Sequence, residues 1–338
     1  MISVVIVSHN GRKWLEGCLA SLQGQTYSNH EIIIVDNAST DDTVRWIEFE
    51  YPQIKLITSM QNLGFASGSN LGIHNSKGDY ILLLNNDTVA DLRFLENLLI
   101  AFERVPNLGA VSGKIILMDE PSKLDNCGAF WTNTTFLYHY GYRQDESLSK
   151  FNGMMPVFSC NGAAMLVKRE ALDEVGLFDD DFWCYNEDVD LCHRLWIAGH
   201  ECWYYPDAVV CHAKGATSSM MDSANVQYHS FKNRLASYIK NCEMLTLLWV
   251  LPIHLALNIL IGLLWLIRGD FKLSLSVFRA LWWNVVNARS TFAKRRRVQA
   301  SRTKDDRSIL SATRKNPPLK YYYYLLVGLD KYREEAGI

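Results

Sequence analysis

Short apolar runs alternate with helix-like stretches through the first hundred residues. The apolar runs read as strands of a buried sheet, and the stretches between them read as helices. The strand-like runs are residues 2–7, 31–36, 54–58 and 80–84, and the helix-like stretches are residues 12–22, 41–49 and 66–75. This alternation predicts an α/β fold with a Rossmann-like, doubly wound, mainly parallel sheet and right-handed crossovers.

The pattern is less regular from residue 108 to residue 142, where we expect loops and short antiparallel strands. Regular patterning then resumes. We expect a strand over residues 158–168, a short helix over residues 169–175, a helix over residues 187–198 that Gly199 ends, and a strand that ends at His212.

Residues 229–338 differ in character from residues 1–228, and the chain is expected to divide there into two regions. The stretch 244–267 has no formal charge and is long enough to cross a bilayer. Basic residues flank both of its ends, which disfavours a single crossing. We therefore expect a helical, basic, membrane-associating region with a re-entrant or interfacial helix pair, whose second piece is residues 271–286. A buried C-terminal helical subdomain is the alternative.

Charge is distributed unevenly along the chain. Residues 1–230 hold 15 Lys and Arg against 29 Asp and Glu, whereas residues 231–338 hold 19 against 7. A basic region with aromatic anchors suits an anionic lipid surface. Because these basic residues accompany an apolar helix rather than a folded basic face, nucleic acid is not an expected partner.

The eight cysteines contain no CxxC pair and no ligand-like spacing, which argues against a zinc site or a disulfide framework. The N-terminal stretch "MISVVIVSHN" reads as a first strand rather than a secretory leader. We therefore expect reduced thiols and a cytoplasmic location for residues 1–228.

Polar side chains follow two of the predicted strands. In "YILLLNNDT" a buried strand runs into Asn85, Asn86 and Asp87, and Asp36 ends another strand in the same way. Ligands bind at this edge of open α/β sheets, and a carboxylate there can hold Mg²⁺ or Mn²⁺ together with a diphosphate. The alternative role for Asp87 is a cap for a helix that begins near residue 91. The turn "NLGFASGSNLG" is weaker evidence for phosphate binding.

The predicted helix at residue 187 begins with three acids, Glu187, Asp188 and Asp190. A helix dipole favours acids in the first turn, yet a half-buried carboxylate beside a cleft can also act as a general base. His212 lies at a strand end before a Gly-containing loop, where it is either a satisfied core histidine or a metal ligand.

Taken together in this order, the motifs resemble those of inverting family 2 glycosyltransferases with the GT-A fold, and most closely those of bacterial rhamnosyltransferases that build O-antigen or other cell-surface polysaccharide. The resemblance covers roughly residues 1–240. It is carried by "VVIVSHN", "IIIVDNASTDDT", "NLGFASGSNLG", "LLLNNDT", "CNGAAMLVKREAL", "FWCYNEDVDLCHRL" and "CHAKGATS".

The resemblance implies a role for each matching residue. Asp188, paired with Glu187, would be the catalytic base, and Asp87 and His212 would hold Mg²⁺ or Mn²⁺. Asn85 stands where the usual metal-binding motif has its first acid. The implied nucleotide-sugar site comprises Ser8, Asn10, Asp36, Asn37, Asn62, Gly64, Phe65, Asn70, Asn85 and Asn86, and the implied acceptor or sugar pocket comprises Asn161, Gly162 and Trp183.

The resemblance also implies partners. The donor would be dTDP-rhamnose, with a UDP-hexose or UDP-N-acetylhexosamine as alternatives, and the acceptor a lipid-linked glycan at the cytoplasmic face of the inner or plasma membrane. The protein would sit on that surface as a peripheral or monotopic protein. Two other functions are weighed against this one: a sugar nucleotidyltransferase, whose Gly-rich basic N-terminal loop is missing, and a non-catalytic membrane-bound partner in a polysaccharide assembly complex.

Overall fold

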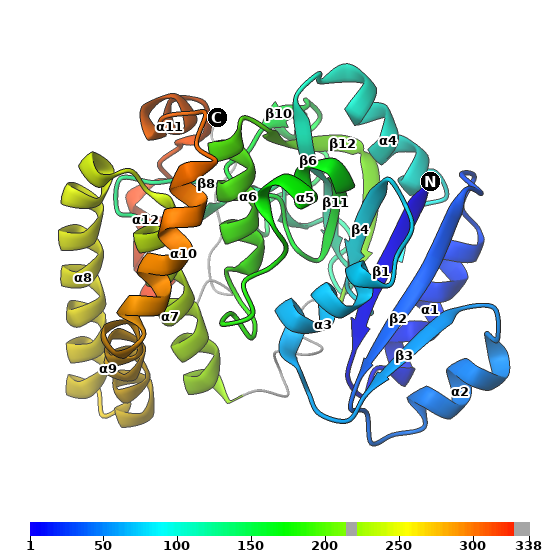
Figure 1. Ribbon diagram of the computed structural model, residues 1–338, viewed down its shortest axis with the longest axis horizontal. Coiled ribbons are helices and arrows are strands. Elements are labelled where there is room, and N and C mark those ends of the chain that lie inside the picture. Colours follow the sequence, from blue (N-terminus) through cyan, green and yellow to red (C-terminus); the bar gives the residue numbers. More distant parts are fainter. Residues whose placement is uncertain (214–221, 328–338) are drawn as a thin grey trace.

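A ten-stranded mixed sheet forms the centre of the computed structural model, which describes residues 1–213 and 222–327 (Figure 1). The strands lie in the order β10-β12-β6-β11-β4-β1-β2-β3, while β5 pairs with β12 and β7 pairs with β6. Two further short strands, β8 and β9, pair with each other outside this sheet, which makes twelve strands within the described residues. Their bounds are β1 (Ile2–Ser8), β2 (His30–Asn37), β3 (Lys55–Ser59), β4 (Tyr80–Leu84), β5 (Thr88–Ala90), β6 (Leu108–Leu117), β7 (Leu124–Asn126), β8 (Ala129–Phe130), β9 (Tyr138–His139), β10 (Met155–Pro156), β11 (Ala164–Lys168) and β12 (Glu201–His212).

The N-terminal half of the sheet matches the predicted doubly wound pattern. Strands β4, β1, β2 and β3 run parallel, and the connecting helices have apolar faces that pack on them. The register pairs Ser8 with Asp36, so these strands end at one common edge. The helices of this half are α1 (Arg12–Gln23), α2 (Thr43–Glu50), α3 (Gly64–His74) and α4 (Phe94–Arg104). The predicted α/β fold class is therefore confirmed.

The expectation of loops and short antiparallel strands from residue 108 was wrong at its start. Residues 108–117 form β6, a long central strand that runs parallel to β12. Its apolar pattern is interrupted by Lys114, which is buried and donates hydrogen bonds to Glu146 and Asn152. The strand expected over residues 158–168 is shorter, because only Ala164–Lys168 joins the ladder, as β11 between β4 and β6.

The C-terminal helices share a core with the sheet. Buried residues of α7 and α8, among them Tyr238 and Val250, belong to the same apolar cluster as Leu83 and Met165 of the sheet. The expected division at residue 228 falls inside α7 and remains a prediction. The remaining helices are α5 (Arg169–Val175), α6 (Glu187–Ala198), α7 (Ser223–Asn241), α8 (Met244–Ile267), α9 (Phe271–Val286), α10 (Ala288–Ala300), α11 (Asp306–Thr313) and α12 (Leu319–Val327), with a 3₁₀ turn at Ser149–Phe151.

Helix α8 buries two of its polar side chains together with part of its apolar surface, and it leaves several leucines exposed. His254 and Asn258 are fully buried, and the His254 ring shares a 2.9 Å hydrogen bond with the Thr135 hydroxyl. Leu245 and Leu248, in contrast, are 79% and 68% exposed. Within the described residues α8 is the one helix long and apolar enough to cross a membrane, judged by length and composition. It forms the edge of the molecule farthest from α2 (Figure 1).

Candidate active site

The polar residues at the carboxyl ends of β1 and β4 meet at one edge of the sheet. Ser8 and Asn86 are both buried, and the Asn86 amide donates to the Ser8 hydroxyl at 3.0 Å. Gly11 lies against this pair, since a Cβ there would fall 2.1 Å from Ser8 Oγ and 2.3 Å from Asn86 Nδ2. The first βα turn is therefore tied by side chains to the end of β4.

The turn after β2 is held by Asn10 and Asp36. The Asn10 side-chain oxygen accepts from the backbone N–H groups of Thr40 and Asp41, at 2.7 and 3.3 Å. One oxygen of Asp36 accepts from the N–H of Ser39 at 3.1 Å, while Oδ1 is buried without a hydrogen-bond partner. An unpartnered buried carboxylate oxygen is costly, so a hydroxyl or amide of a ligand would satisfy it.

A second cluster joins the start of α3 to the loop before α6, residues 176–186, which we call the acidic loop because it contains three consecutive aspartates. Asn37 donates to the Asn62 side chain and to the Gly64 carbonyl, each at 3.0 Å. The Phe65 N–H donates to the Trp183 carbonyl at 2.7 Å. Gly64 has a φ of +75°, and a Cβ there would lie 2.3 Å from the Trp183 carbonyl oxygen, so the position requires glycine.

Asn70 fastens the acidic loop to α3. Its side chain donates to the Phe178 carbonyl at 2.9 Å and to Asp180 at 3.0 Å, and it accepts from the Phe178 N–H at 3.0 Å. The side chain is 8% exposed. Asn70 therefore shapes the wall of the site through the loop that it holds.

Asp87 and His212 are brought face to face. Their side chains are 4% and 9% exposed, and His212 Nε2 lies 3.3 Å from Asp87 Oδ1. The other ring nitrogen, Nδ1, lies 2.9 Å from Asp125 Oδ2. Asn85 Nδ2 lies 3.4 Å from His212 Nε2. Burial disfavours a charged ring, but the hydrogen bonds to Asp125 and Asp87 outweigh it and raise the pKa of His212 to about 9.

This donor set fits a divalent ion that displaces the ring proton of His212 and is shared with a ligand. Asp125 orients the His212 ring as second-sphere carboxylates orient metal-bound histidines. Among the described residues no group of three or more His, Cys, Asp or Glu side chains is arranged to hold a metal by itself. Asp87 and His212 would thus supply two positions, and the oxygens of a bound diphosphate would supply others. The Gly-containing loop after His212, residues 214–218, lies outside the described residues.

The structure excludes the alternative that Asp87 is a helix cap. Residues 88–90 form β5, and α4 begins only at Phe94 with Arg93 at its N-cap. Asp36 likewise precedes a turn rather than a helix, because α2 has Asp42 at its N-cap.

Asp188 lies beside the entry to β11. Its Oδ2 accepts from the Gly162 N–H at 2.9 Å, and its Oδ1 accepts from the Val189 N–H at 2.8 Å. The Asn161 side chain closes the same turn by accepting from the Ala163 N–H at 2.9 Å. The Ala163 carbonyl in turn accepts from the Asn85 N–H at 2.9 Å. This short series of contacts connects the Asp188 carboxylate to the segment that carries Asp87.

The two neighbouring acids differ in environment. Burial raises the pKa of Asp188 to about 6, although the hydrogen bond from Gly162 opposes the shift. Burial, and next the charge of Asp188, raise the pKa of Glu187 to about 8. Glu187 is 8% exposed, and its Oε2 has no hydrogen-bond partner, whereas Asp188 is half-buried. Asp188 is therefore the member of the pair that is ionised at neutral pH and reachable from solvent.

Two residues at the site were missed by the sequence analysis. Asp125 lies in a segment without a regular pattern and meets His212 only through the fold. Asn233 of α7 donates to the carbonyls of Cys184 and Tyr185, at 2.8 and 2.7 Å. Nothing in the sequence around either residue signals these contacts.

Comparison with known proteins places the chain in a family. The family model described as "Glycosyl transferase family 2" matches residues 3–176 of the 338. The N-acetylglucosaminyl-diphospho-decaprenol L-rhamnosyltransferase of Mycobacterium tuberculosis is 27% identical over 299 residues, which cover 81% of this chain and 91% of the relative. The poly-beta-1,6-N-acetyl-D-glucosamine synthase of Staphylococcus epidermidis is 27% identical over 211 residues. These residues cover 62% of this chain and 48% of that relative.

Solved structures share the fold. A mannosyltransferase from Pyrobaculum calidifontis in complex with GDP-Man and Mn²⁺ superposes with a TM-score of 0.52 at 16% identity, covering 89% of this chain and 85% of that one. GalNAc-T7 with UDP, GalNAc and Mn²⁺ gives a TM-score of 0.57 at 16% identity, covering 71% and 48% respectively. The fold is therefore that of GT-A glycosyltransferases, as expected from the motifs.

Proposed function

The chain belongs to glycosyl transferase family 2, and we propose that it is an inverting, metal-dependent glycosyltransferase that moves a sugar from a nucleotide diphosphate to a lipid-linked glycan in cell-surface polysaccharide synthesis. The observation that carries the proposal is a short series of contacts between the segments of two acids. The Asp188 carboxylate accepts from Gly162, and the neighbouring Ala163 carbonyl accepts from the N–H of Asn85, two residues before Asp87. Inverting transfer needs these two functions side by side: a base for the acceptor and a charged anchor for the leaving group.

Asp188 accepts the proton of the acceptor hydroxyl while the hydroxyl oxygen attacks the anomeric carbon of the donor sugar. The bond between that carbon and the diphosphate breaks, and its electron pair leaves with the diphosphate. Since the attack comes from the face opposite the leaving group, one displacement inverts the anomeric configuration. The Gly162 N–H holds the Asp188 carboxylate in place through its 2.9 Å hydrogen bond.

Asp87 and His212 would hold Mg²⁺ or Mn²⁺, which when bound supplies Lewis-acid stabilisation of the departing diphosphate. On the donor side, the unpartnered Oδ1 of Asp36 offers an acceptor to the ribose or base. The buried pair Ser8 and Asn86 and the Asn37–Asn62–Gly64 cluster form the floor beneath it.

The donor is proposed to be dTDP-rhamnose, with a UDP-hexose or UDP-N-acetylhexosamine as the alternatives. The rhamnosyltransferase relative, which matches most of both chains, supports rhamnose. The same relative is named for a diphospho-decaprenol substrate, and this supports a lipid-linked acceptor.

The membrane part of the proposal rests on α8 and α9. The exposed leucines of α8 are unfavourable in water and favourable in a lipid interface. Helix α9 adds Phe271 and Trp282, each 67% exposed, and Arg268 and Lys272 lie at the turn between the helices. We propose that this surface rests on the cytoplasmic face of the inner or plasma membrane as a peripheral or monotopic attachment, which brings Asp188 to lipid-borne acceptors.

The test is donor turnover by the purified full-length protein. A panel of dTDP- and UDP-sugars is incubated with Mg²⁺ or Mn²⁺ and a lipid-linked acceptor, and the released nucleotide diphosphate is measured. We expect metal-dependent release from one donor, lost in Asp87→Asn and Asp188→Asn and kept in Asp91→Asn, an exposed carboxylate four residues from Asp87. Calorimetry of nucleotide binding with Mn²⁺ gives a readout separate from turnover, and Asp87→Asn should weaken that binding whereas Asp188→Asn should not.

Two results would contradict the proposal. Absence of release from every donor, even with membrane extract as the acceptor source, would favour a non-catalytic partner of an assembly complex. Equal release by Asp188→Asn and the unaltered protein would remove Asp188 as the base.

A further inference from the structure

The backbone just before α6 has an unusual conformation. Tyr185 and Asn186 are consecutive non-glycine residues with φ of 66° and 68°. Left-handed conformations of such residues are uncommon and persist only where the surroundings hold them. Asp188 follows two residues later, so the backbone conformation of Tyr185 and Asn186 determines the position from which the Asp188 side chain extends.

A residue from the C-terminal region holds this segment. Asn233 of α7 is fully buried, and its amide donates to the Cys184 and Tyr185 carbonyls at 2.8 and 2.7 Å. Both bonds come from the same amide nitrogen. Two successive carbonyls are therefore turned toward one donor, and this orientation accompanies the left-handed backbone at Tyr185.

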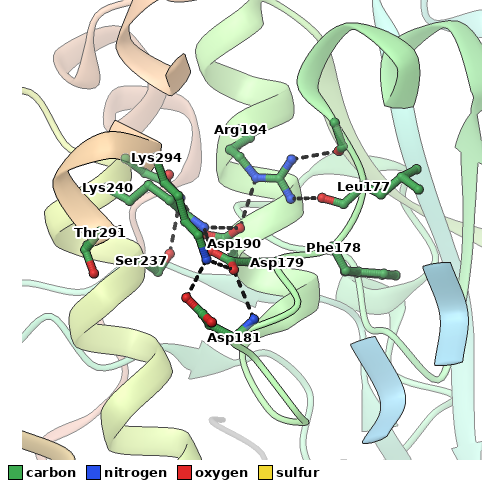
Figure 2. Close-up of polar contacts among 12 residues, drawn as sticks. Leu177, Phe178, Asp179, Asp181, Asp190, Arg194, Ser237, Lys240, Thr291 and Lys294 are labelled. Carbon is green, nitrogen blue, oxygen red and sulfur yellow. Dashed lines mark hydrogen bonds and ion pairs between the residues drawn. The ribbon is translucent and has the colours of Figure 1, made fainter. Parts of the chain in front are cut away.

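A buried charge cluster fixes α7 against α6 two turns further on (Figure 2). Asp190 is fully buried; it accepts from Lys240 at 3.0 Å, from Arg194 at 2.9 Å and from Asn241 at 2.9 Å. Lys240 also contacts Asp179, at 2.6 Å. Because a buried charge is costly unless it is paired, this cluster permits little sliding of α7 along α6.

We propose that Asn233 is a positioning residue for the catalytic base: it holds residues 184–186 in the conformation that aims the Asp188 carboxylate at the acceptor. The proposal rests on the proposed function, since it gives α7 a part in the same reaction. The Asp190 cluster maintains the distance from which Asn233 reaches the two carbonyls. Through Asn233, α7 then takes part in positioning the proposed base, while the helices that follow it serve the proposed membrane attachment.

The contact predicts a specific defect. Without the Asn233 amide, the carbonyls of Cys184 and Tyr185 lose their shared donor, and Asp188 shifts from Gly162. A displacement of about 1 Å at a reacting group lowers the rate on the order of a hundredfold. Loss of the Gly162 hydrogen bond would also raise the Asp188 pKa, because that bond favours the charged carboxylate. Donor binding, made by other elements, should persist.

The experiment compares Asn233→Ala with Asn284→Ala in the full-length protein. Asn284 is a matched control: it is a buried asparagine on α9 whose amide also donates to two carbonyls, those of Lys232 and Ala280. We expect Asn233→Ala to lower kcat at least about tenfold and to move the acidic midpoint of the kcat/KM profile upward. Nucleotide binding should change less than about twofold. Asn284→Ala should lose similar thermal stability and keep both kcat and the midpoint.

Hydrogen exchange provides a readout that does not need turnover. In Asn233→Ala the amides of residues 183–188 should exchange faster than in Asn284→Ala. If Asn233→Ala does not fold, the same measurements are made on the milder variant Asn233→Ser. That variant should show the same changes in kcat, midpoint and exchange to a smaller extent.

Equal kcat, midpoint and exchange in the Asn233 and Asn284 variants would overturn the positioning role while leaving the proposed function intact. If the unaltered protein turned over no donor, the proposed function would fail instead. Faster exchange confined to the Asn233 variants would then show that Asn233 orders the segment without serving this reaction.

Discussion

At the scale of single residues, the proposed chemistry requires one of two adjacent acids, Asp188, to be charged while the other, Glu187, is neutral. Asp188 has a pKa raised to about 6, so it is ionised at neutral pH and becomes protonated as the pH falls through that value. A protonated Asp188 cannot accept a proton. We expect kcat/KM to fall about tenfold per pH unit below about 6.

The measurement is the pH profile of donor turnover with saturating metal. A flat profile between pH 7 and pH 5, with nucleotide binding unchanged, would contradict the role of Asp188.

Glu187 provides the complementary prediction. Its pKa of about 8 keeps it neutral at pH 7, so Glu187→Gln should resemble the form already present. We expect this variant to keep turnover within about threefold, whereas Asp188→Asn should lose at least about a hundredfold. Steady-state turnover of the two variants decides between them, and a comparable loss in both would mean that the acids act as a unit.

Some site residues were predictable from the sequence and others were not. Asp87 and Asp36 follow buried strands, so their common edge follows from the strand pattern. Asp125 and Asn233 gave no such signal, because their partners lie 87 and 48 or 49 residues away and the contacts exist only after the helices and strands have packed. Tertiary partners of this kind leave no periodicity in the chain.

At the scale of elements, the start of α3 is fixed to the loop before α6 through Gly64. The prediction concerns Gly64→Ala, in which the new Cβ would meet the Trp183 carbonyl at 2.3 Å on top of the cost of a left-handed alanine. We expect the free energy of unfolding to fall by about 3 kcal/mol and donor turnover to decrease. Denaturant unfolding and turnover assays check both effects.

Gly269→Ala is the matched control. Gly269 has a φ of +82°, and the position that a Cβ would occupy is open space. The free energy of unfolding of this variant should therefore fall by only about 1 kcal/mol, and its activity should be kept. Similar losses in the two variants would mean that the contact with Trp183 contributes little.

Elements with a clean pattern were predicted well, and elements with a mixed composition were not. Strands β1, β2 and β4 are continuous apolar runs and were placed within a residue or two. Strand β6 contains Gly, Ser and Lys in a buried ladder, so no pattern in its sequence distinguishes it from a loop. Its place between β11 and β12 compensates for the weak local preference.

At the scale of the whole molecule, helices α8 and α9, which carry exposed apolar side chains, lie at the opposite end from α2 (Figure 1). We predict that Leu248→Gln and Trp282→Gln each lower partitioning onto anionic vesicles roughly tenfold, because each removes an outward apolar side chain. Vesicle sedimentation measures this partitioning. Turnover of a water-soluble acceptor should be unchanged.

Phe49→Gln is the control at the far end. Phe49 is 82% exposed on α2 and outside the proposed attachment surface. If it lowered partitioning as much as the other two variants, the attachment would not be specific to α8 and α9.

The reversed direction of β11 has a consequence for how new specificities can arise. Because β11 runs opposite to β4, its first residues arrive at the edge where β4 ends, and the turn before it supplies Gly162 to Asp188. The segment that leads into this turn, residues 151–161, is separate in sequence from the strand that carries Asp87. Substitutions in that segment are therefore expected to alter the proposed acceptor pocket while the proposed metal and donor anchors stay in place, so that acceptor choice can evolve separately from donor choice.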